Sequence, residues 1–346
     1  MKGFFKERIR AAFLVFFALT FLAVPFFCSC DKETKSEIYY GYFDTVCVFS
    51  DYSGMSNGEF SAAEKAVGAS LEKYHRLFDV HNEYEGLVNL ATVNKMAGQG
   101  KVKVDKEIID LLSFSKEMHE LTEGKVNIAM GAPISLWKSL SKKGERIPTE
   151  DELNSLSKHT SIDSLVIDRE NLTVELLDSE MSLDVGAIAK GFAAELIKSE
   201  LIEADISGVV LDLGGNLCAV GTKPDGSGWS TGIKNPLYAE GAEQPYSRKV
   251  TLSAGALVTS GAYERYYTVG GVRYHHIIDP ETLMPENRYL SVTVMAKDSG
   301  VADALSTAIF NMDYGKAQDF VSKLTDIEVT LIMNDGSVTV LPQGEK

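Results

Sequence analysis

Between positions 184 and 190 the chain carries residue types that can bind a phosphate or diphosphate. One carboxylate and one ammonium enclose three small residues: Asp184, Gly186, Ala187, Ala189 and Lys190. Residues 192–201 place apolar side chains at helical spacing, so the small residues should lie at the N-terminus of a helix. The free N–H groups of a helix N-terminus favour an anion, and small side chains let it approach the backbone.

The same spacing also allows an interpretation without a ligand. Asp184 then caps the helix, Gly186 and Gly191 serve packing against a sheet, and Lys190 is solvated. The spacing alone does not separate the two interpretations.

Two oxygen-bearing residues four positions apart, Asp303 and Thr307, have the types and spacing of a partial magnesium site. In a helix this spacing places both on one face. Mg²⁺ prefers oxygen ligands and usually takes few of them from the protein, with phosphates and water completing its shell. The alternative is that Asp303 is only an acidic residue in the first helical turn.

His276 lies in the strand-like segment 274–280 and has an ordinary pKa near physiological pH. Such a histidine can transfer protons in a reaction, and it can equally be a hydrogen-bonded core residue. The segment alone leaves both open.

The elements that must position these residues indicate an α+β fold. Apolar periodicity predicts helices at 60–78, 105–121 and 301–310, and a capping box at Thr149 begins a short helix. Strand patterns occur at 39–49, 209–213, 229–233, 250–253 and 256–260. Hairpins are indicated at 165–177, around Gly270-Gly271 and at 329–341. Strands joined mostly by hairpins, with helices inserted, predict one domain built on a mostly antiparallel sheet.

The first 38 residues have the pattern of a targeting region. Basic residues precede an apolar run that is interrupted by Pro25 and followed by Cys28-Ser29-Cys30. We therefore expect a lipoprotein-type export signal at 1–30 with lipid on Cys30, a tether at 31–38 and a catalytic domain at 39–346. The alternative is an ordinary signal peptide or an uncleaved anchor. Cys28 is a poorer lipid acceptor because the bulky Phe27 precedes it.

The charge and cysteine content exclude some function classes. A formal net charge of −15 speaks against a nucleic-acid partner, which requires a basic face. Cys47 and Cys218 each lie in an apolar run, so we expect two buried thiols rather than a disulfide bridge.

Several motifs resemble those of the ApbE family, the FAD:protein FMN transferases. The longest is Leu-Asp-Val-Gly-Ala-Ile-Ala-Lys-Gly at 183–191. Others are Asp-x-Gly-Gly-Asn at 212–216, Ser-Gly-x-Tyr-Glu-Arg at 260–265 and His-Ile-Ile-Asp-Pro at 276–280. The chain departs from the family pattern at Leu283, where the family has glycine.

The resemblance implies a set of site residues. Mg²⁺ would be bound by Asp303, Thr307 and the carbonyl group of Ala187. Asp184, Lys190 and His276 would be catalytic. FAD would be bound by those three together with Phe43, His81, Lys125, Val126, Asn127, Gly214, Gly215 and Ile277.

The resemblance also implies an activity. A Mg²⁺-dependent transferase would cleave FAD, attach FMN through a phosphoester to a Ser or Thr of an acceptor protein, and release AMP. Its partners would be flavin-carrying subunits of membrane redox pumps, met on the outer face of the bacterial cytoplasmic membrane, the periplasmic side in a diderm. An FAD pyrophosphatase giving FMN and AMP, or a flavin-binding lipoprotein without turnover, are the alternatives.

Overall fold

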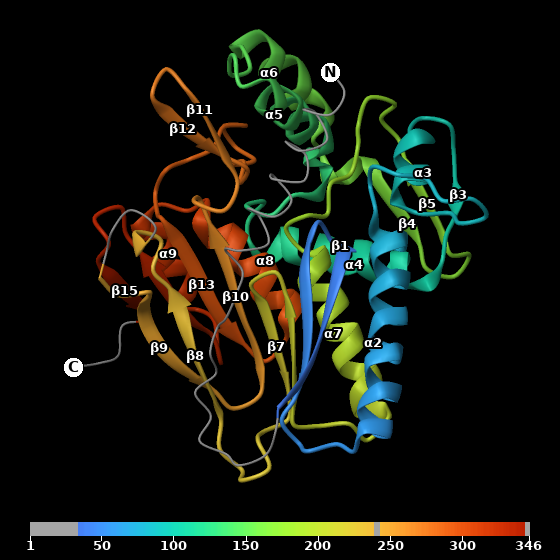
Figure 1. The fold of residues 1–346 in the computed structure, drawn as a ribbon. Helices are drawn as coiled ribbons and strands as arrows, with labels where there is room; N and C mark the ends of the chain where they lie inside the picture. Colours follow the sequence, from blue (N-terminus) through green and yellow to red (C-terminus); the bar gives the residue numbers. More distant parts are fainter. Residues whose placement is uncertain (1–33, 239–242, 343–346) are drawn as a thin grey trace, which may run out of the picture. The chain divides into compact units, whose positions relative to one another are not determined.

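An eight-stranded sheet organises the computed structural model, which describes residues 34–238 and 243–342 (Figure 1). Its strand order is β1-β2-β6-β7-β10-β13-β14-β15, and every neighbouring pair is antiparallel. The strands are β1 Lys35–Tyr42, β2 Thr45–Asp51, β6 Val209–Leu213, β7 Asn216–Val220, β10 Gly255–Gly261, β13 Ser291–Ala296, β14 Glu328–Ile332 and β15 Val338–Leu341. The α+β fold with a mostly antiparallel sheet is therefore confirmed.

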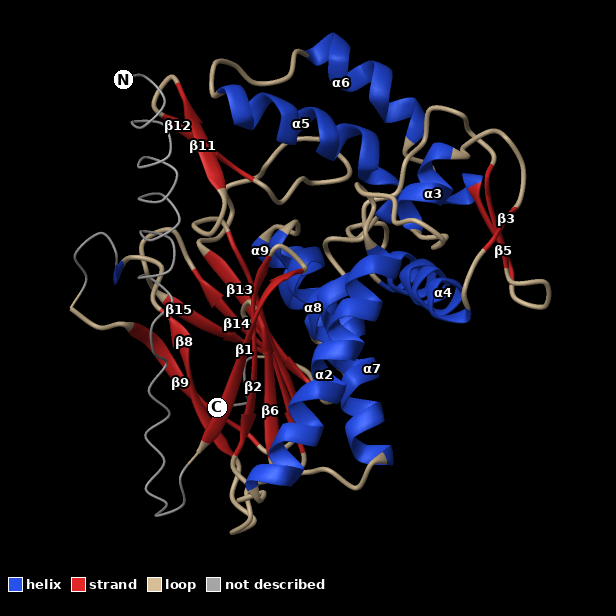
Figure 2. Cartoon of the chain, turned by 45° about the vertical axis from the view of Figure 1, so that its right-hand side comes forward, coloured by secondary structure: helices blue, strands red, loops and turns tan. Residues whose placement is uncertain are grey.

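Helices cover one face of this sheet, and a hairpin covers the other (Figure 2). The helices are α2 Asn57–Phe78, α7 Ala189–Glu203 and α8 Ser299–Phe310, and the hairpin is β8 Trp229–Lys234 with β9 Tyr246–Leu252. Strand β6 shows why both faces are filled, because successive side chains point to opposite sides of a strand. Val209 and Leu211 join the core under the helices, whereas Val210 packs with Trp229 of the hairpin.

Smaller elements surround the sheet in the described part of the chain. They are α3 Leu90–Lys95, α4 Lys106–Leu121, α5 Gly131–Lys143, α6 Glu150–Leu156 and α9 Tyr314–Val321, with 3₁₀ turns at Ile128–Met130, Ser157–His159 and Ile162–Ser164. Strands β3 Val102–Lys103, β5 Thr173–Leu176 and β4 Leu165–Asp168 form one small sheet, and β11 Tyr266–Val269 with β12 Val272–His275 form another. The capping box predicted at Thr149 is present at the start of α6.

One strand expected at 39–49 is in fact two strands. Phe43 and Asp44 adopt positive φ angles of 50° and 53°, which end β1 at Tyr42 and turn the chain into β2. Strand β1 begins at Lys35, so residues 35–38 belong to the sheet and not to the tether. The apolar pattern continues through both strands, so the sequence predicts a single strand here.

Cys47 and Cys218 are free, buried thiols, as predicted. The expected signal and both cysteines proposed for lipidation lie outside the described residues. Among the residues that are described, no helix is long and apolar enough to cross a membrane.

Candidate active site

The N-terminus of α7 binds a carboxylate of the protein itself. The Gly191 N–H donates to Oδ2 of Asp303 over 2.8 Å, and Lys190 Nζ lies 3.4 Å from the same oxygen. Helices α7 and α8 meet closely here, because a Cβ on Gly191 would lie 2.3 Å from the Ser299 carbonyl oxygen and 2.5 Å from the Asp303 Cβ. Gly191 is therefore required for this contact.

Asp303 is buried, with 4% of its surface exposed. Burial raises the pKa of its carboxyl group, and the Lys190 ammonium and the Gly191 N–H oppose that rise. Lys190 is partly buried, so the alternative in which it is merely solvated is wrong. A buried carboxylate that is held by two donors but remains unfavourable in its charged form suits a cation.

Asp184 does not cap α7. The N-cap position is Ile188, which makes no side-chain cap bond, and Asp184 Oδ1 instead accepts the N–H of Gly186 over 2.9 Å. Its own N–H donates to the Ile128 carbonyl oxygen over 2.8 Å. Asp184 thus shapes the turn that leads into α7 and remains partly exposed beside it.

Thr307 lies one turn after Asp303 on α8 and is linked to β10. Its Oγ1 is 3.2 Å from the Ser260 Oγ, which in turn is 2.8 Å from the Ser306 Oγ. The Ser306 hydroxyl donates to the Asp303 carbonyl oxygen over 2.9 Å. These contacts bring the two predicted metal ligands of α8 together with the end of a central strand.

The oxygen atoms of this region suit Mg²⁺. Asp303 supplies a carboxylate and Thr307 a hydroxyl, and the Ala187 carbonyl oxygen accepts no hydrogen bond from any described residue. Asn216 lies beside this group: its Oδ1 accepts from Ser299 Oγ over 2.7 Å, and its buried Nδ2 makes no hydrogen bond of normal geometry with a described residue. Its side chain is nevertheless close enough to Asp303 to oppose the rise in the pKa of that carboxyl group. Hard oxygen ligands beside an unsatisfied polar group are what a Mg²⁺–phosphate site requires.

The two adjacent histidines have different environments. His275 is buried, where its Nε2 donates to the Glu286 carbonyl oxygen over 3.2 Å and its Nδ1 accepts the Ile277 N–H. The sequence left open whether His276 is a hydrogen-bonded core histidine. In the structure His275 has that role. His276 itself is exposed on one side.

The backbone of Arg265 fixes the tautomer of His276. Both the backbone N–H and Nδ1 of His276 face the Arg265 carbonyl oxygen, at 3.1 and 3.2 Å. A carbonyl oxygen cannot donate, so Nδ1 carries the proton and Nε2 keeps its lone pair. Part of the His276 side chain is exposed, but many protein atoms surround the imidazole and displace water from it. This loss of water, followed by the charge of Arg265, lowers the pKa of His276 to about 4, and the Lys190 charge contributes to the shift. The ring is therefore a neutral base within electrostatic range of Lys190.

The turn between β1 and β2 is tied to the same group. The Arg265 guanidinium donates to the Asp44 carbonyl oxygen over 2.8 Å, so one residue joins this turn to His276. Phe43 donates its N–H to His75 Nδ1 and packs its ring edge-on to that imidazole at 5.7 Å. Phe43 is thus held by His75 in the turn that Arg265 links to His276.

Gly214 and Gly215 form the turn between β6 and β7 with positive φ angles of 64° and 89°. A Cβ on Gly214 would lie 2.0 Å from the Thr45 Oγ1, so the first glycine allows the two turns to touch. Since β2 pairs with β6, both turns lie at one end of the sheet. Asn216 follows directly and brings its side-chain amide to the same end.

The three consecutive residues 125–127 have side chains engaged in structural contacts. Lys125 Nζ is buried between Asp279 Oδ1 at 3.1 Å and Glu281 Oε2 at 2.9 Å. Val126 is in the core, and Asn127 donates to the Thr160 carbonyl oxygen over 2.8 Å while capping a 3₁₀ turn. Their role in FAD binding stays a prediction.

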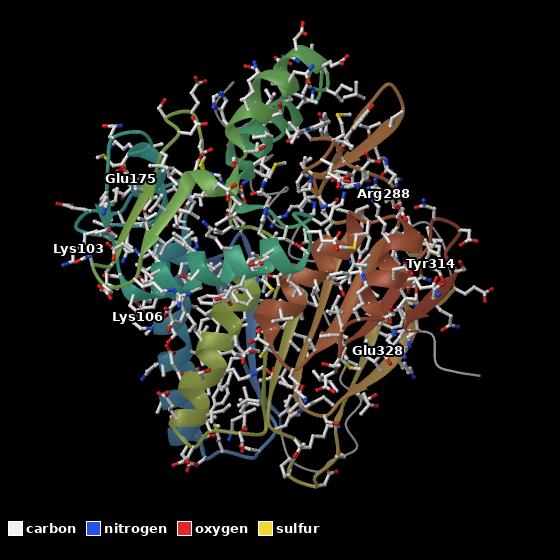
Figure 3. All side chains as sticks on the ribbon, turned by 180° about the vertical axis from the view of Figure 1, so that it is seen from behind. Lys103, Lys106, Glu175, Arg288, Tyr314 and Glu328 are labelled. Carbon is white, nitrogen blue, oxygen red and sulfur yellow. The ribbon has the colours of Figure 1, made fainter. Side chains whose placement is uncertain are left out.

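Asp279 also accepts a hydrogen bond from Arg288 over 3.1 Å. Figure 3 shows Arg288 on the same side of the molecule as Tyr314 and on the opposite side from Lys103 and Lys106. This carboxylate with two cations holds the segment that follows His276.

His81 and Ile277 are less closely associated with the Asp303 group. His81 is exposed, and its Nε2 lies 2.8 Å from Lys138 Nζ on α5, so no contact among described residues joins it to Asp303. Tyr84 of the same loop does approach the Phe43 turn, because its hydroxyl is 3.5 Å from His75 Nε2. Ile277 is 7% exposed and packs in the main core. The predicted flavin contacts of both residues are untested.

Sequence reasoning missed three polar residues of this region: Asn216, Ser260 and Arg265. Each lies inside a motif that we quoted, but its partner is distant in the chain, such as Ser299 for Asn216. Only the motif membership could have drawn attention to them.

Comparison with known proteins shows the family of this chain. Residues 42–331 match the model of the ApbE family. The FAD:protein FMN transferase of Treponema pallidum is 31% identical over 322 residues, covering 89% of this chain and 86% of that protein. The FAD:protein FMN transferase of Klebsiella pneumoniae is 29% identical over 271 residues, covering 76% and 83%.

Solved structures agree as well. The crystal structure of the ApbE protein of Thermotoga maritima has a TM-score of 0.78 and 26% identity, covering 89% of this chain and 96% of that one. The apo form of the Pseudomonas stutzeri flavinyl transferase ApbE shares the fold, with a TM-score of 0.74 at 20% identity over 91% and 96% of the two chains. This chain belongs to the ApbE family.

Proposed function

We propose that this protein is a Mg²⁺-dependent FAD:protein FMN transferase. The observation that carries the proposal is the buried Asp303 carboxylate, which Gly191 and Lys190 hold one helical turn before Thr307. The same Lys190 lies close enough to His276 to help lower the pKa of that histidine. The names of the relatives support the substrate, FAD, and the type of acceptor, a protein.

In the proposed reaction, a Ser or Thr hydroxyl of the acceptor attacks the flavin-side phosphorus of FAD. The new P–O bond links FMN to the acceptor, the P–O bond to the adenylate breaks, and AMP leaves with the bond electrons. The hydroxyl proton passes to a base. Phosphoryl transfer of this kind depends mostly on positioning and on neutralising charge.

Each residue has a task in this reaction. His276 Nε2 accepts the hydroxyl proton, because Nδ1 is committed to the Arg265 carbonyl oxygen. Lys190 places a positive charge near the diphosphate, and Asp184 keeps the α7 entry turn in shape. Asp303, Thr307 and the Ala187 carbonyl would hold Mg²⁺, which supplies Lewis-acid stabilisation of the phosphate oxygens.

The residues assigned to flavin binding form the remaining part of the proposal. Phe43 at the β1–β2 turn and the glycines at 214–215 would face the ring and the nucleotide. Their position at the end of the sheet that carries Asn216 supports this assignment.

We also propose that the protein acts outside the cytoplasm. Residues 1–30 would be an export signal and Cys30 the lipid-bearing residue, so that the domain is anchored on the outer face of the cytoplasmic membrane. Acceptors would then be flavin-carrying subunits of membrane redox pumps. The basic and apolar pattern of the first 27 residues, followed by Cys28-Ser29-Cys30, supports the anchor.

One incubation tests the transfer. Purified protein, Mg²⁺ and FAD are combined with and without an acceptor domain, and free FMN, AMP and acceptor mass are measured. Transfer requires AMP release that depends on the acceptor and covalent FMN on the acceptor. Equal FMN and AMP release without acceptor would instead identify a pyrophosphatase, and no release at all would identify a flavin-binding protein.

A further inference from the structure

Three hydroxyl groups form a chain that ends at a predicted metal ligand. The chain runs from Thr307 Oγ1 to Ser260 Oγ at 3.2 Å, from there to Ser306 Oγ at 2.8 Å, and then to the Asp303 carbonyl oxygen at 2.9 Å. Ser306 is fully buried, whereas Ser260 and Thr307 are partly buried. The chain therefore begins at the site and ends inside the protein.

Only one orientation of the hydroxyl protons makes all three hydrogen bonds at the same time. A carbonyl oxygen can only accept, so the single proton of Ser306 points to Asp303. Ser306 must then accept the proton of Ser260. Ser260 has no second proton, so Thr307 must donate to Ser260.

This direction has a consequence for Thr307. A hydroxyl that donates its proton to one side keeps its lone pairs for the other side. If Ser260 donated instead, the Thr307 proton would be free to point towards a bound cation and would repel it. The fixed chain removes that arrangement before any ligand arrives.

We propose that Ser260 and Ser306 are positioning residues that orient the Thr307 hydroxyl as a lone-pair donor to the metal. The inference deepens the proposed function and rests on its assignment of Thr307 as a ligand. Ser306 acts through Ser260, since its contacts go to Ser260 and the Asp303 backbone rather than to Thr307. Groups that orient a ligand in this way commonly change metal affinity by about 10–100-fold when removed.

The test measures metal binding without turnover. Mn²⁺ takes the same oxygen ligands as Mg²⁺ and can be counted as free ion by electron paramagnetic resonance. The full-length protein and its Ser260→Ala and Ser306→Ala variants are titrated with Mn²⁺, and the dissociation constant and melting temperature are recorded for each.

We expect both alanine variants to raise the dissociation constant by about 10-fold, the lower end of the usual range. Ser260→Ala removes the acceptor of the Thr307 proton. Ser306→Ala frees the Ser260 proton to turn towards Thr307, which reverses the chain. Ser260→Thr keeps a hydroxyl at the same place and should restore the wild-type constant within about twofold.

Thr259 provides a matched control. It precedes Ser260 in β10, faces the opposite side of the sheet, and shares a hydroxyl pair of 2.8 Å with Thr293. Thr259→Ala therefore loses a similar hydrogen bond without touching α8. Its dissociation constant should equal that of the wild type.

Two results would overturn the inference. One is a Ser306→Ala variant that binds Mn²⁺ as tightly as Thr259→Ala, because the chain would then not control Thr307. The other is a wild-type protein that binds no Mn²⁺. If the wild type binds Mn²⁺ and both serine variants weaken it while no FMN transfer is found, the inference holds and the proposed function fails.

Discussion

Replacing Asp303 with asparagine should abolish metal binding and leave the fold intact. The carboxylate does two things in the structure. Its Oδ2 accepts the Gly191 N–H over 2.8 Å, and its charge faces Lys190 and the predicted Mg²⁺ site. Asparagine keeps an oxygen for the first task and removes the charge required for the second.

The stability effect of two substitutions can be worked out from these contacts. Asp303→Ala leaves the buried Gly191 N–H without a partner, which costs about 1–3 kcal/mol of unfolding free energy. Asp303→Asn keeps that bond and also removes a charge that burial disfavours, so its melting temperature should stay close to that of the wild type. The alanine variant should melt a few degrees lower.

The effect on the reaction should be far larger than the effect on stability. Lewis-acid stabilisation of a phosphate is typically worth several kcal/mol, and each 1.36 kcal/mol is about tenfold in rate. Asp303→Asn should therefore slow acceptor-dependent AMP release by about 10²–10³-fold or more.

The assay combines Mn²⁺ titration, thermal unfolding and single-turnover AMP release on wild type and both variants. An asparagine variant that is folded and retains full Mg²⁺-dependent turnover would refute the metal assignment. So would an asparagine variant whose loss of rate is matched by unfolding.

Four further predictions concern other parts of the chain. His276→Ala should slow single-turnover transfer by about 10²–10⁴-fold at saturating FAD with little change in FAD affinity, and an equal loss of affinity would speak against a base. Because the pKa of His276 is lowered to about 4, its neutral form persists below pH 6.5, so the wild-type rate should fall only near pH 4–5; a fall centred at 6.5 would contradict the assignment. Leu283→Gly should lower the unfolding free energy by about 1–3 kcal/mol in a denaturant titration. Burial of the leucine side chain beside Trp137 should stabilise the fold by more than glycine would gain from relief of the positive φ of 55°. A more stable variant would contradict this comparison. Cys30→Ser should release the protein from membranes in cell fractionation, and unchanged retention would indicate a different anchor.

The sequence allowed the main elements to be predicted because their patterns are local. Helix α2 and the hairpin at Gly270–Gly271 follow from apolar spacing and turn residues within a few positions. The break between β1 and β2 could not be predicted, since Phe43 and Asp44 adopt positive φ through contacts with His75 and Arg265, which are distant in the chain.

The site was predicted in its residue types but not in its contacts. We expected the N-terminus of α7 to attract a phosphate. In the structure its Gly191 N–H donates to the Asp303 carboxylate, and phosphate binding there stays a prediction. The spacing of Asp303 and Thr307 did not indicate that Asp303 is buried, and the close approach at Gly191 is what buries it. Such an approach depends on two residues that are 112 positions apart in the chain.

Departure from the family pattern at Leu283 has a local explanation. Its backbone keeps the positive φ that glycine adopts easily, and its side chain is buried in a small apolar cluster. Its carbonyl oxygen accepts from the Trp137 Nε1 over 2.8 Å. The turn after Asp279 is therefore formed with leucine in place.

The central claim is transfer of FMN to a protein, and the mass of an acceptor tests it most directly. An acceptor domain is co-expressed with the wild-type protein or with Asp303→Asn, purified, and analysed intact and as peptides by mass spectrometry. The account predicts that wild type adds one FMN, less one water, to a single Ser or Thr, and that Asp303→Asn leaves the acceptor unmodified. An unmodified acceptor in the presence of active wild-type protein, with FMN and AMP accumulating free, would contradict it.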